Sequence, residues 1–172
     1  ECVGRAFKEN SWPAFVSGRC VYINSDGEPW VVHVPRRRSW RRMVYQGHGL
    51  CQQSTFWSRR AYESSGGLNE TLQFSFDYEL FVRLCQVQRP VLLEQVLAGF
   101  RIHADSKTSN IQRIAERENA ELRRRFGAHP ALIPICPYVQ RLDFSRRMRN
   151  SWSWFVSQRA IRSLLAASLA AD

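Results

Sequence analysis

The segment DYELFVRLCQVQRPVLLEQVLAGFRI, residues 77–102, predicts a helix that is followed directly by a strand. Pro90 separates the two elements because proline cannot continue a helix. Residues 91–102 are rich in strand-forming side chains. A helix and a strand in such close succession favour an α/β sheet over a helical bundle or a β-sandwich. The helical half is indicated by apolar residues that recur at helical spacing: Leu80, Phe81, Leu84 and Val87.

The flanking sequence continues this alternation of helices and strands. Ser58 can cap a helix that Gly66 and Gly67 then end, and Gly127 ends a charged helix further on. Residues 24–27 are a turn signal, with Gly27 able to take a positive φ. The fold class predicted is therefore α/β, a sheet flanked by helices. The expected helices cover residues 1–9, 58–64 and 110–126, the expected strands residues 14–24, 30–34 and 50–56, and a basic loop residues 35–42.

The composition is that of one globular domain with a hydrophobic core. The chain has 172 residues, of which 44% are hydrophobic and 23% are charged. No uncharged apolar run approaches the roughly 20 residues that span a bilayer. The sequence begins with Glu1 rather than Met, and no signal-like stretch follows. We therefore expect a fragment or a processed piece of a longer protein.

The five cysteines are scattered, and no two of them lie two or three residues apart. This spacing argues against a disulfide framework and against a zinc site of thiolates. Buried free thiols in a reducing cytosol are the expected state.

The formal net charge is +10, and arginine carries almost all of the positive charge. Such a field attracts anions: nucleic acid, acidic lipid or a phosphorylated substrate. Arginine also favours bidentate contacts with phosphate. A solvated basic surface without a dedicated partner is the alternative interpretation. The clusters are Arg36-Arg37-Arg38 with Arg41-Arg42, Arg123-Arg124-Arg125, and Arg146-Arg147 with Arg149.

Residues 129–172 differ from the rest and are expected to form a separate part after a main portion at 1–128. Three prolines are followed by a pattern, residues 144–170, that predicts one long basic amphipathic helix containing tryptophans. Such a helix suits peripheral contact with an anionic membrane. It suits packing onto another part of the protein equally well.

An ordered series of short motifs between about residues 7 and 126 resembles the C-terminal, acceptor-side half of a family 2 glycosyltransferase with the GT-A fold. The resemblance implies a partial GT-A-like mixed sheet flanked by helices. It also implies transfer of a sugar, with inversion, from a nucleotide-diphosphate donor to an acceptor hydroxyl. The motifs are Val16-Ser17-Gly18 with Asp26-Gly27, Gln53-Ser54-Thr55-Phe56-Trp57 with Arg59-Arg60, Gly66-Gly67-Leu68-Asn69-Glu70, Asp77-Tyr78-Glu79-Leu80 with Arg83-Leu84, and Phe100-Arg101-Ile102-His103 with Ser106-Lys107-Thr108.

In this family a nucleotide-binding half with paired aspartates precedes the region that begins near Phe7. The sequence contains no Asp-x-Asp motif. We therefore expect a divalent metal, Mn²⁺ or Mg²⁺, to be held mainly by that missing half, and this fragment to be inactive alone.

Asp77 matches the general base of the family. A carboxylate within hydrogen-bond reach of the acceptor hydroxyl can take its proton as the hydroxyl attacks the sugar. The alternative is that Asp77 only satisfies backbone N–H groups and the dipole at a helix start. The two roles are compatible. Phe76 stands where family members often have a glutamate.

The resemblance assigns three further residues to the donor side. His103 matches a position that often supplies a metal ligand, and Arg101 and Lys107 could face the diphosphate. A surface histidine at a strand end and two solvated cations are the alternatives.

Four residues could bind the acceptor: Gln53, Ser54 and Thr55 through hydrogen bonds, and Trp57 through its flat ring. Trp57 as a core residue is the alternative. Residues 36–42 could bind a phosphorylated lipid acceptor on the basis of charge alone.

The resemblance implies a hexosyltransferase-like enzyme of envelope polysaccharide or glycan synthesis. Its partners would be a nucleotide-diphosphate sugar and a glycan or lipid-linked acceptor. It would act in the cytoplasm, peripherally on the inner face of the membrane. Two other classes stay open: a basic module that binds nucleic acid or other anions, and a non-catalytic glycosyltransferase remnant. Nucleic acid is disfavoured because no nucleic-acid-binding motif is recognisable.

Overall fold

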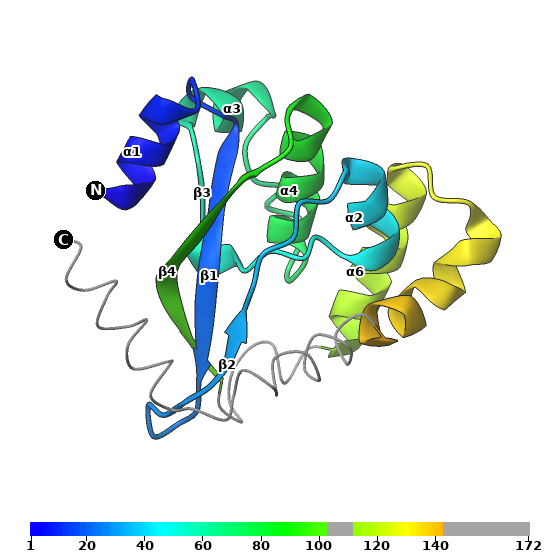
Figure 1. Ribbon diagram of the computed structural model, residues 1–172. Coiled ribbons are helices and arrows are strands. Elements are labelled where there is room, and N and C mark those ends of the chain that lie inside the picture. The colour runs from blue at the N-terminus through cyan, green and yellow to red at the C-terminus, as the bar shows by residue number, and fades with distance from the viewer. Residues whose placement is uncertain (103–111, 143–172) are drawn as a thin grey trace.

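Strand β1 (Phe15–Ile23) is the central strand of a four-stranded mixed sheet in the computed structural model, which describes residues 1–102 and 112–142 (Figure 1). Strand β4 (Val91–Arg101) runs parallel to β1 along one edge. The other edge is shared by two antiparallel strands, β2 (Pro29–His33) and β3 (Thr55–Trp57). The sheet therefore places the carboxyl ends of β1 and β4 next to each other.

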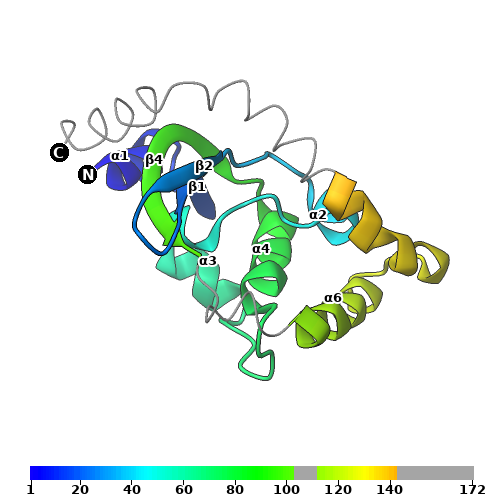
Figure 2. The same cartoon turned by 90° about the horizontal axis from the view of Figure 1, so that it is seen from below.

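Helices flank both faces of this sheet (Figures 1 and 2). Because successive strand residues point to opposite faces, Val16 packs against α1 (Cys2–Glu9), whereas Phe15 faces α4 (Phe76–Val87). Further from the sheet on the α4 side lie α2 (Trp40–Gln46) and α6 (Gln112–Arg125). Three shorter elements complete the fold: η1 (Gln52–Ser54), α3 (Arg59–Ser64) and η2 (Pro130–Ile135).

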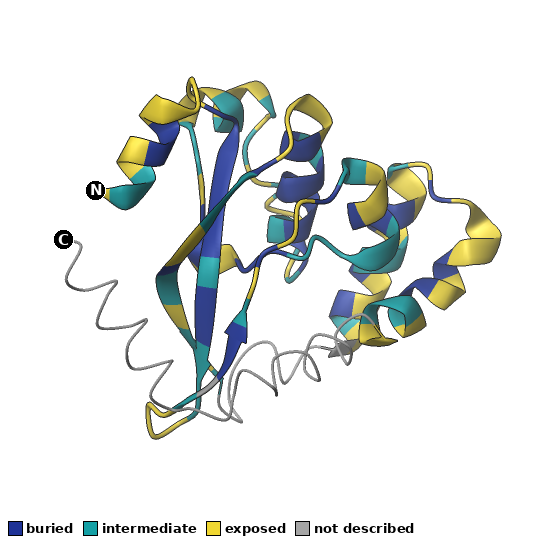
Figure 3. Ribbon diagram, in the orientation of Figure 1, coloured by how far each residue is buried: buried dark blue, intermediate teal, exposed yellow. Residues whose placement is uncertain are grey.

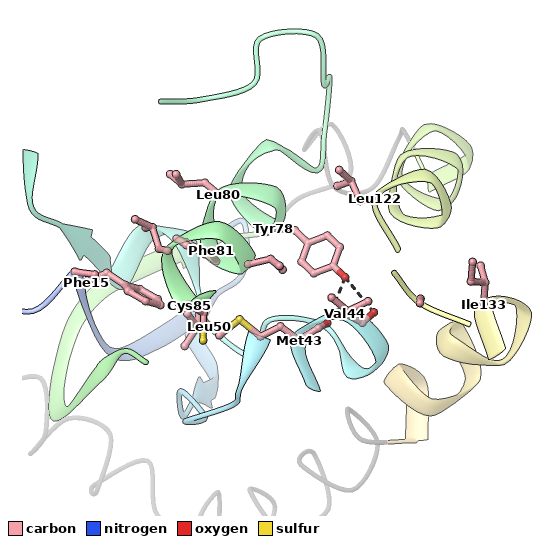
Figure 4. Close-up of a cluster of buried hydrophobic side chains, with 14 residues drawn as sticks. Phe15, Met43, Val44, Leu50, Tyr78, Leu80, Phe81, Cys85, Leu122 and Ile133 are labelled. Atoms are coloured by element: carbon pink, nitrogen blue, oxygen red, sulfur yellow. Dashed lines mark hydrogen bonds between the residues drawn. The ribbon is translucent and has the colours of Figure 1, made fainter. Parts of the chain in front are cut away.

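The main core lies between the sheet, α4 and α2, and it extends to α6 and η2 (Figures 3 and 4). The ring of Phe15 stacks on that of Phe81 from α4, with centroids 6.2 Å apart. From the same helix, the buried hydroxyl of Tyr78 reaches the carbonyl oxygens of Met43 at 3.3 Å and Val44 at 3.1 Å. Helix α4 thus fixes both the sheet and the C-terminal part of α2.

Replacing Tyr78 with phenylalanine is expected to lower the free energy of unfolding by about 1 kcal/mol, the net value of one buried hydrogen bond. Burial raises the pKa of Tyr78, so its hydroxyl remains a donor across the ordinary pH range. Urea denaturation followed by circular dichroism measures the change. Tyr138→Phe is the matched control because the Tyr138 side chain is exposed, and it should leave stability unchanged. Equal effects of the two variants would contradict the role assigned to the Tyr78 hydroxyl.

The α/β class is confirmed, as are most of the expected elements. Ser58 caps α3 by accepting from the Ala61 N–H at 3.1 Å, and Gly66 and Gly67 take φ values of 87° and 72° after it. The predicted strand at residues 50–56 was wrong at its start, because η1 precedes a strand that begins only at Thr55.

The expected basic loop at residues 35–42 was wrong beyond Ser39. Helix α2 begins at Trp40, with the Ser39 side chain accepting from the Arg42 N–H. Its C-terminal end is held by Arg38, which lies just before the helix: the buried guanidinium donates to the carbonyls of Gln46 and Gly47. A seven-residue helix depends on such contacts more than on its own propensity.

Several expectations concern residues outside the described ranges, namely the helix at 144–170 and the side chains of His103 and Lys107. Within residues 1–102 and 112–142, no helix combines the length and the apolar character needed to cross a bilayer.

Candidate active site

A cleft of about 890 Å³ opens beside the carboxyl ends of β1 and β4. Tyr22 of β1 and Phe100 of β4 are partners in the parallel register, and both line the cleft. The opposite wall comes from the start of α4, from α6 and from residues 137–141. In open α/β sheets, ligands bind beyond the carboxyl ends of parallel strands, so the position of this cleft marks it as the candidate site.

The sheet side of the cleft is aromatic. The ring of Tyr22 lies 5.6 Å from that of Phe100 in an edge-on arrangement and 6.1 Å from the imidazole of His33, on which it stacks. These three rings form a rigid surface of the kind that packs against the apolar face of a ligand.

Asp77 lines this cleft from the first turn of α4. Its Oδ1 accepts a hydrogen bond from the N–H of Tyr78 at 2.7 Å. No cation within residues 1–102 and 112–142 forms an ion pair with Asp77. The half-buried carboxylate thus accepts from one backbone N–H at the helix start, as the alternative for Asp77 predicts, and it also lines the cleft.

Glu118, a buried residue of α6, holds the backbone segment that precedes Asp77. The Glu118 carboxylate accepts from the backbone N–H groups of Gln73 at 2.7 Å, Phe74 at 3.0 Å and Ser75 at 2.9 Å. The helix-capping residue Ser75 makes no side-chain capping bond of its own. Glu118 instead anchors residues 73–75, the segment that leads into α4, to helix α6. Burial alone would raise the pKa of Glu118, but these N–H donors outweigh burial and lower the pKa below its usual range.

His48 also lines the cleft and was not singled out by the sequence. Its Nδ1 accepts from the N–H of Leu50 at 3.2 Å, so its neutral form carries the proton on Nε2. The ring packs 5.4 Å from that of Phe81 and 6.0 Å from that of Tyr78. The only sequence signal was a histidine flanked by glycines, Gly47 and Gly49, which take φ values of 76° and 68°.

Of the acceptor residues expected beside one another, only Gln53 reaches the cleft. The Ser54 hydroxyl is buried and donates to the Gly18 carbonyl at 2.9 Å, while the Thr55 hydroxyl donates to the Cys51 carbonyl at 2.6 Å. The Ser54 hydroxyl thus ties η1 to β1, and the Thr55 hydroxyl also lies within hydrogen-bond distance of the Ser17 hydroxyl in β1, at 2.9 Å. The structure therefore does not bring Ser54 and Thr55 to the cleft.

Trp57 and Arg101 also lie away from the cleft lining. The centroid of the Trp57 ring lies 6.3 Å from that of Tyr62, on which it stacks, and 6.2 Å from that of Phe81, which it meets edge-on. Trp57 therefore packs with the core, as the alternative interpretation of this residue predicted. The guanidinium of Arg101 donates to the Ser25 carbonyl at 2.6 Å and thus braces the turn between β1 and β2. His103 and Lys107 lie outside the described residues.

The described residues do not fit a metal site of their own. Within residues 1–102 and 112–142, no three side chains of His, Cys, Asp or Glu converge on one point. All five cysteines are free thiols, and all but Cys2 are buried.

A scan against protein-family models finds no match to this chain, and a search of curated proteins finds no sequence similar to it. The candidate site consequently stands on its own geometry: an α/β sheet, an aromatic wall and an acid at a helix start.

Proposed function

We propose that this chain is the acceptor-side part of an inverting sugar transferase with a GT-A-like fold. The observation that carries the proposal is the Asp77 carboxylate, which lies on the wall of a cleft at the sheet's carboxyl edge without a cationic partner among the described residues. A carboxylate in that state can accept a proton from a bound hydroxyl.

The remaining lining suits a saccharide. Amide groups donate and accept hydrogen bonds at once, as sugar hydroxyls require, and aromatic rings pack on the C–H faces of sugars. The Tyr22–Phe100 wall supplies such rings. The amide side chains in the cleft are Gln46, Gln52, Gln53, Asn119 and Gln140.

The chemistry assigned to Asp77 is removal of the proton from the acceptor hydroxyl as its oxygen forms the bond to the anomeric carbon of the donor sugar. The bond from that carbon to the diphosphate breaks, and the diphosphate leaves with the electron pair. One base suffices because a diphosphate leaves as a stabilised anion, whereas a glycoside hydrolase needs a second carboxyl group as acid. The divalent metal expected through the nucleotide-binding half would stabilise the charge of the departing diphosphate, and residues 1–102 and 112–142 hold no cluster of ligands for it.

The test is release of nucleoside diphosphate by the complete enzyme, including the nucleotide-binding half that the proposal requires, from nucleotide-diphosphate sugars and saccharide acceptors. Acceptor-dependent release is expected. If release never depends on an acceptor, and the protein instead binds an oligonucleotide in a salt-sensitive way, the chain is a basic binding module and the proposal is wrong.

Gln53→Ala is expected to raise the KM for the acceptor about tenfold and to leave kcat nearly unchanged, because it removes one hydrogen-bonding group from the ground state and transition state alike. The Gln53 side chain is exposed, and its Oε1 accepts from the Cys51 thiol at 3.0 Å. Gln86→Ala is the control, since Gln86 is exposed on α4 outside the cleft lining. An equal change in KM in both variants would contradict an acceptor contact by Gln53.

A further inference from the structure

Arg123 is a buried cation in the wall of the cleft. Only 2% of its surface is exposed, yet no Asp or Glu among residues 1–102 and 112–142 forms an ion pair with it. A buried charge without a counter-charge is unfavourable, and proteins normally pair such groups. Either a group of the fold or a bound ligand must therefore compensate the positive charge of Arg123.

Neutral carbonyl groups hold the guanidinium in place. Its Nε donates to the Val44 carbonyl at 3.2 Å. With the Gln140 amide turned so that its oxygen faces the donors, Gln140 Oε1 accepts from Arg123 Nη2 at 2.6 Å and from the Gly47 N–H at 3.1 Å. These contacts use part of a fork that carries five N–H donors. They fix the orientation of Arg123 without neutralising its charge.

The dipole of α2 does not account for this charge. The C-terminal end of a helix carries about half a negative charge, and a cation near it is favourable. However, Arg38 already donates to the Gln46 and Gly47 carbonyls at that end. Half a negative charge would in any case not neutralise the full positive charge of Arg123.

Arg141 adds a second guanidinium to the lining of the same cleft. It directly follows Gln140, it lines the cleft, and its side chain is exposed. Like Arg123, it forms no ion pair with a carboxylate among the described residues. Two arginine forks match a phosphate dianion in charge and offer bidentate contacts to its oxygens.

We propose that Arg123 and Arg141 form a phosphate-binding site, so that the acceptor carries a phosphate group as well as the hydroxyl that reacts. The inference rests on the proposed function and deepens it by naming the substrate class. A volume of about 890 Å³ lies within the range of small-molecule sites and leaves room for a glycosyl phosphate. Asp77 and Glu116 line the same cleft and would repel a phosphate, so the phosphate is assigned to Arg123 and Arg141.

The first experiment is calorimetric titration of the full chain with glucose 1-phosphate, with glucose and acetate as neutral and carboxylate probes. Arg141→Gln is expected to weaken binding of glucose 1-phosphate about tenfold, the value of one charge-assisted contact. Arg117→Gln is the control, because Arg117 is exposed on α6 outside the cleft lining, and it should leave the affinity unchanged. Absence of binding, or equal losses in the two variants, would overturn the proposal. Acetate binding as tight as that of glucose 1-phosphate would overturn the assignment to phosphate.

Arg123→Lys keeps the positive charge and removes the fork, so it should also weaken binding of glucose 1-phosphate. Arg123→Met should abolish that binding. If the methionine variant does not fold, the lysine and Arg141 variants still decide the question.

Flotation with phosphatidylcholine vesicles, with and without polyprenyl phosphate, separates a lipid-borne phosphate from a soluble one. If the protein floats only with vesicles that contain polyprenyl phosphate, and Arg141→Gln abolishes this flotation, the acceptor is lipid-linked. If the protein does not float with these vesicles but binds glucose 1-phosphate, the acceptor is soluble. Asp77→Asn should retain phosphate binding. Failure of sugar transfer and failure of the phosphate site are thus observed separately.

Discussion

Asp77→Asn is expected to lower the turnover number of the complete enzyme about a hundred- to ten-thousandfold, which is the usual contribution of a positioned general base. Asparagine has the shape of aspartate, and its carbonyl oxygen can still accept from the Tyr78 N–H that Oδ1 now accepts at 2.7 Å. The start of α4 should therefore stay intact. What the variant loses is the capacity to take a proton.

The measurement is kcat for sugar transfer, beside the affinity for the nucleotide-diphosphate sugar and the midpoint of thermal unfolding. Affinity and midpoint should match those of the wild type. Glu116→Gln is the control for charge, because it removes another carboxylate of the same cleft. If Glu116→Gln lost as much turnover as Asp77→Asn, the negative charge of the cleft would be what matters, and Asp77 would not be shown to act as a base. Near-wild-type turnover of Asp77→Asn would restrict Asp77 to satisfying the helix start.

The parts of the fold that could be predicted are those governed by local sequence. Apolar spacing and Pro90 define α4 and β4, and the Ser58 cap with the glycine pair defines α3. Helix α2 was missed because its arginine-rich sequence has the composition of a loop. Its stability comes from Arg38, which donates to carbonyls eight and nine residues further along the chain, and from packing against α4, a contact between separate segments.

Of the candidate site residues that the structure describes, Asp77 and Gln53 are the two that line the cleft. Asp77 was named because it matches the general base of the family that the sequence resembles, and Gln53 because it offers a hydrogen-bonding group. Arg123 was visible as one of three consecutive arginines, but the sequence does not tell which of them is buried. The structure buries Arg123 and leaves Arg124 and Arg125 exposed.

Glu118 is an intermediate case. It falls on the apolar side of the predicted helix, among Ala115 and Leu122, where a carboxylate is out of place. That position is a signal that the residue is buried and has partners. Which donors it meets depends on the packing of α6 on α4, since Gln73 lies 45 residues away in the chain.

Glu118→Gln is expected to lower the free energy of unfolding at neutral pH by about 2–3 kcal/mol. The wild-type carboxylate accepts from three backbone N–H groups, whereas the glutamine amide would direct its own N–H donors at one or more of them. Turnover should fall as well, because the start of α4 that carries Asp77 loses its anchor. Glu121→Gln should cost less than about 1 kcal/mol, because Glu121 is an exposed residue of α6 whose one ion pair among the described residues is with Arg124.

The pH dependence distinguishes this role from a simple loss of packing. Because the hydrogen bonds lower the pKa of Glu118 in the folded state, its contribution is fully present above the unfolded pKa of about 4.3. The contribution disappears as the pH falls through the lower, folded pKa. The stability difference between wild type and Glu118→Gln, measured by urea denaturation, should therefore be constant from neutral pH down to about pH 5 and should shrink below about pH 4. A difference that stayed constant through acid pH would mean that the carboxylate charge is not what holds residues 73–75, and that shape alone positions Asp77.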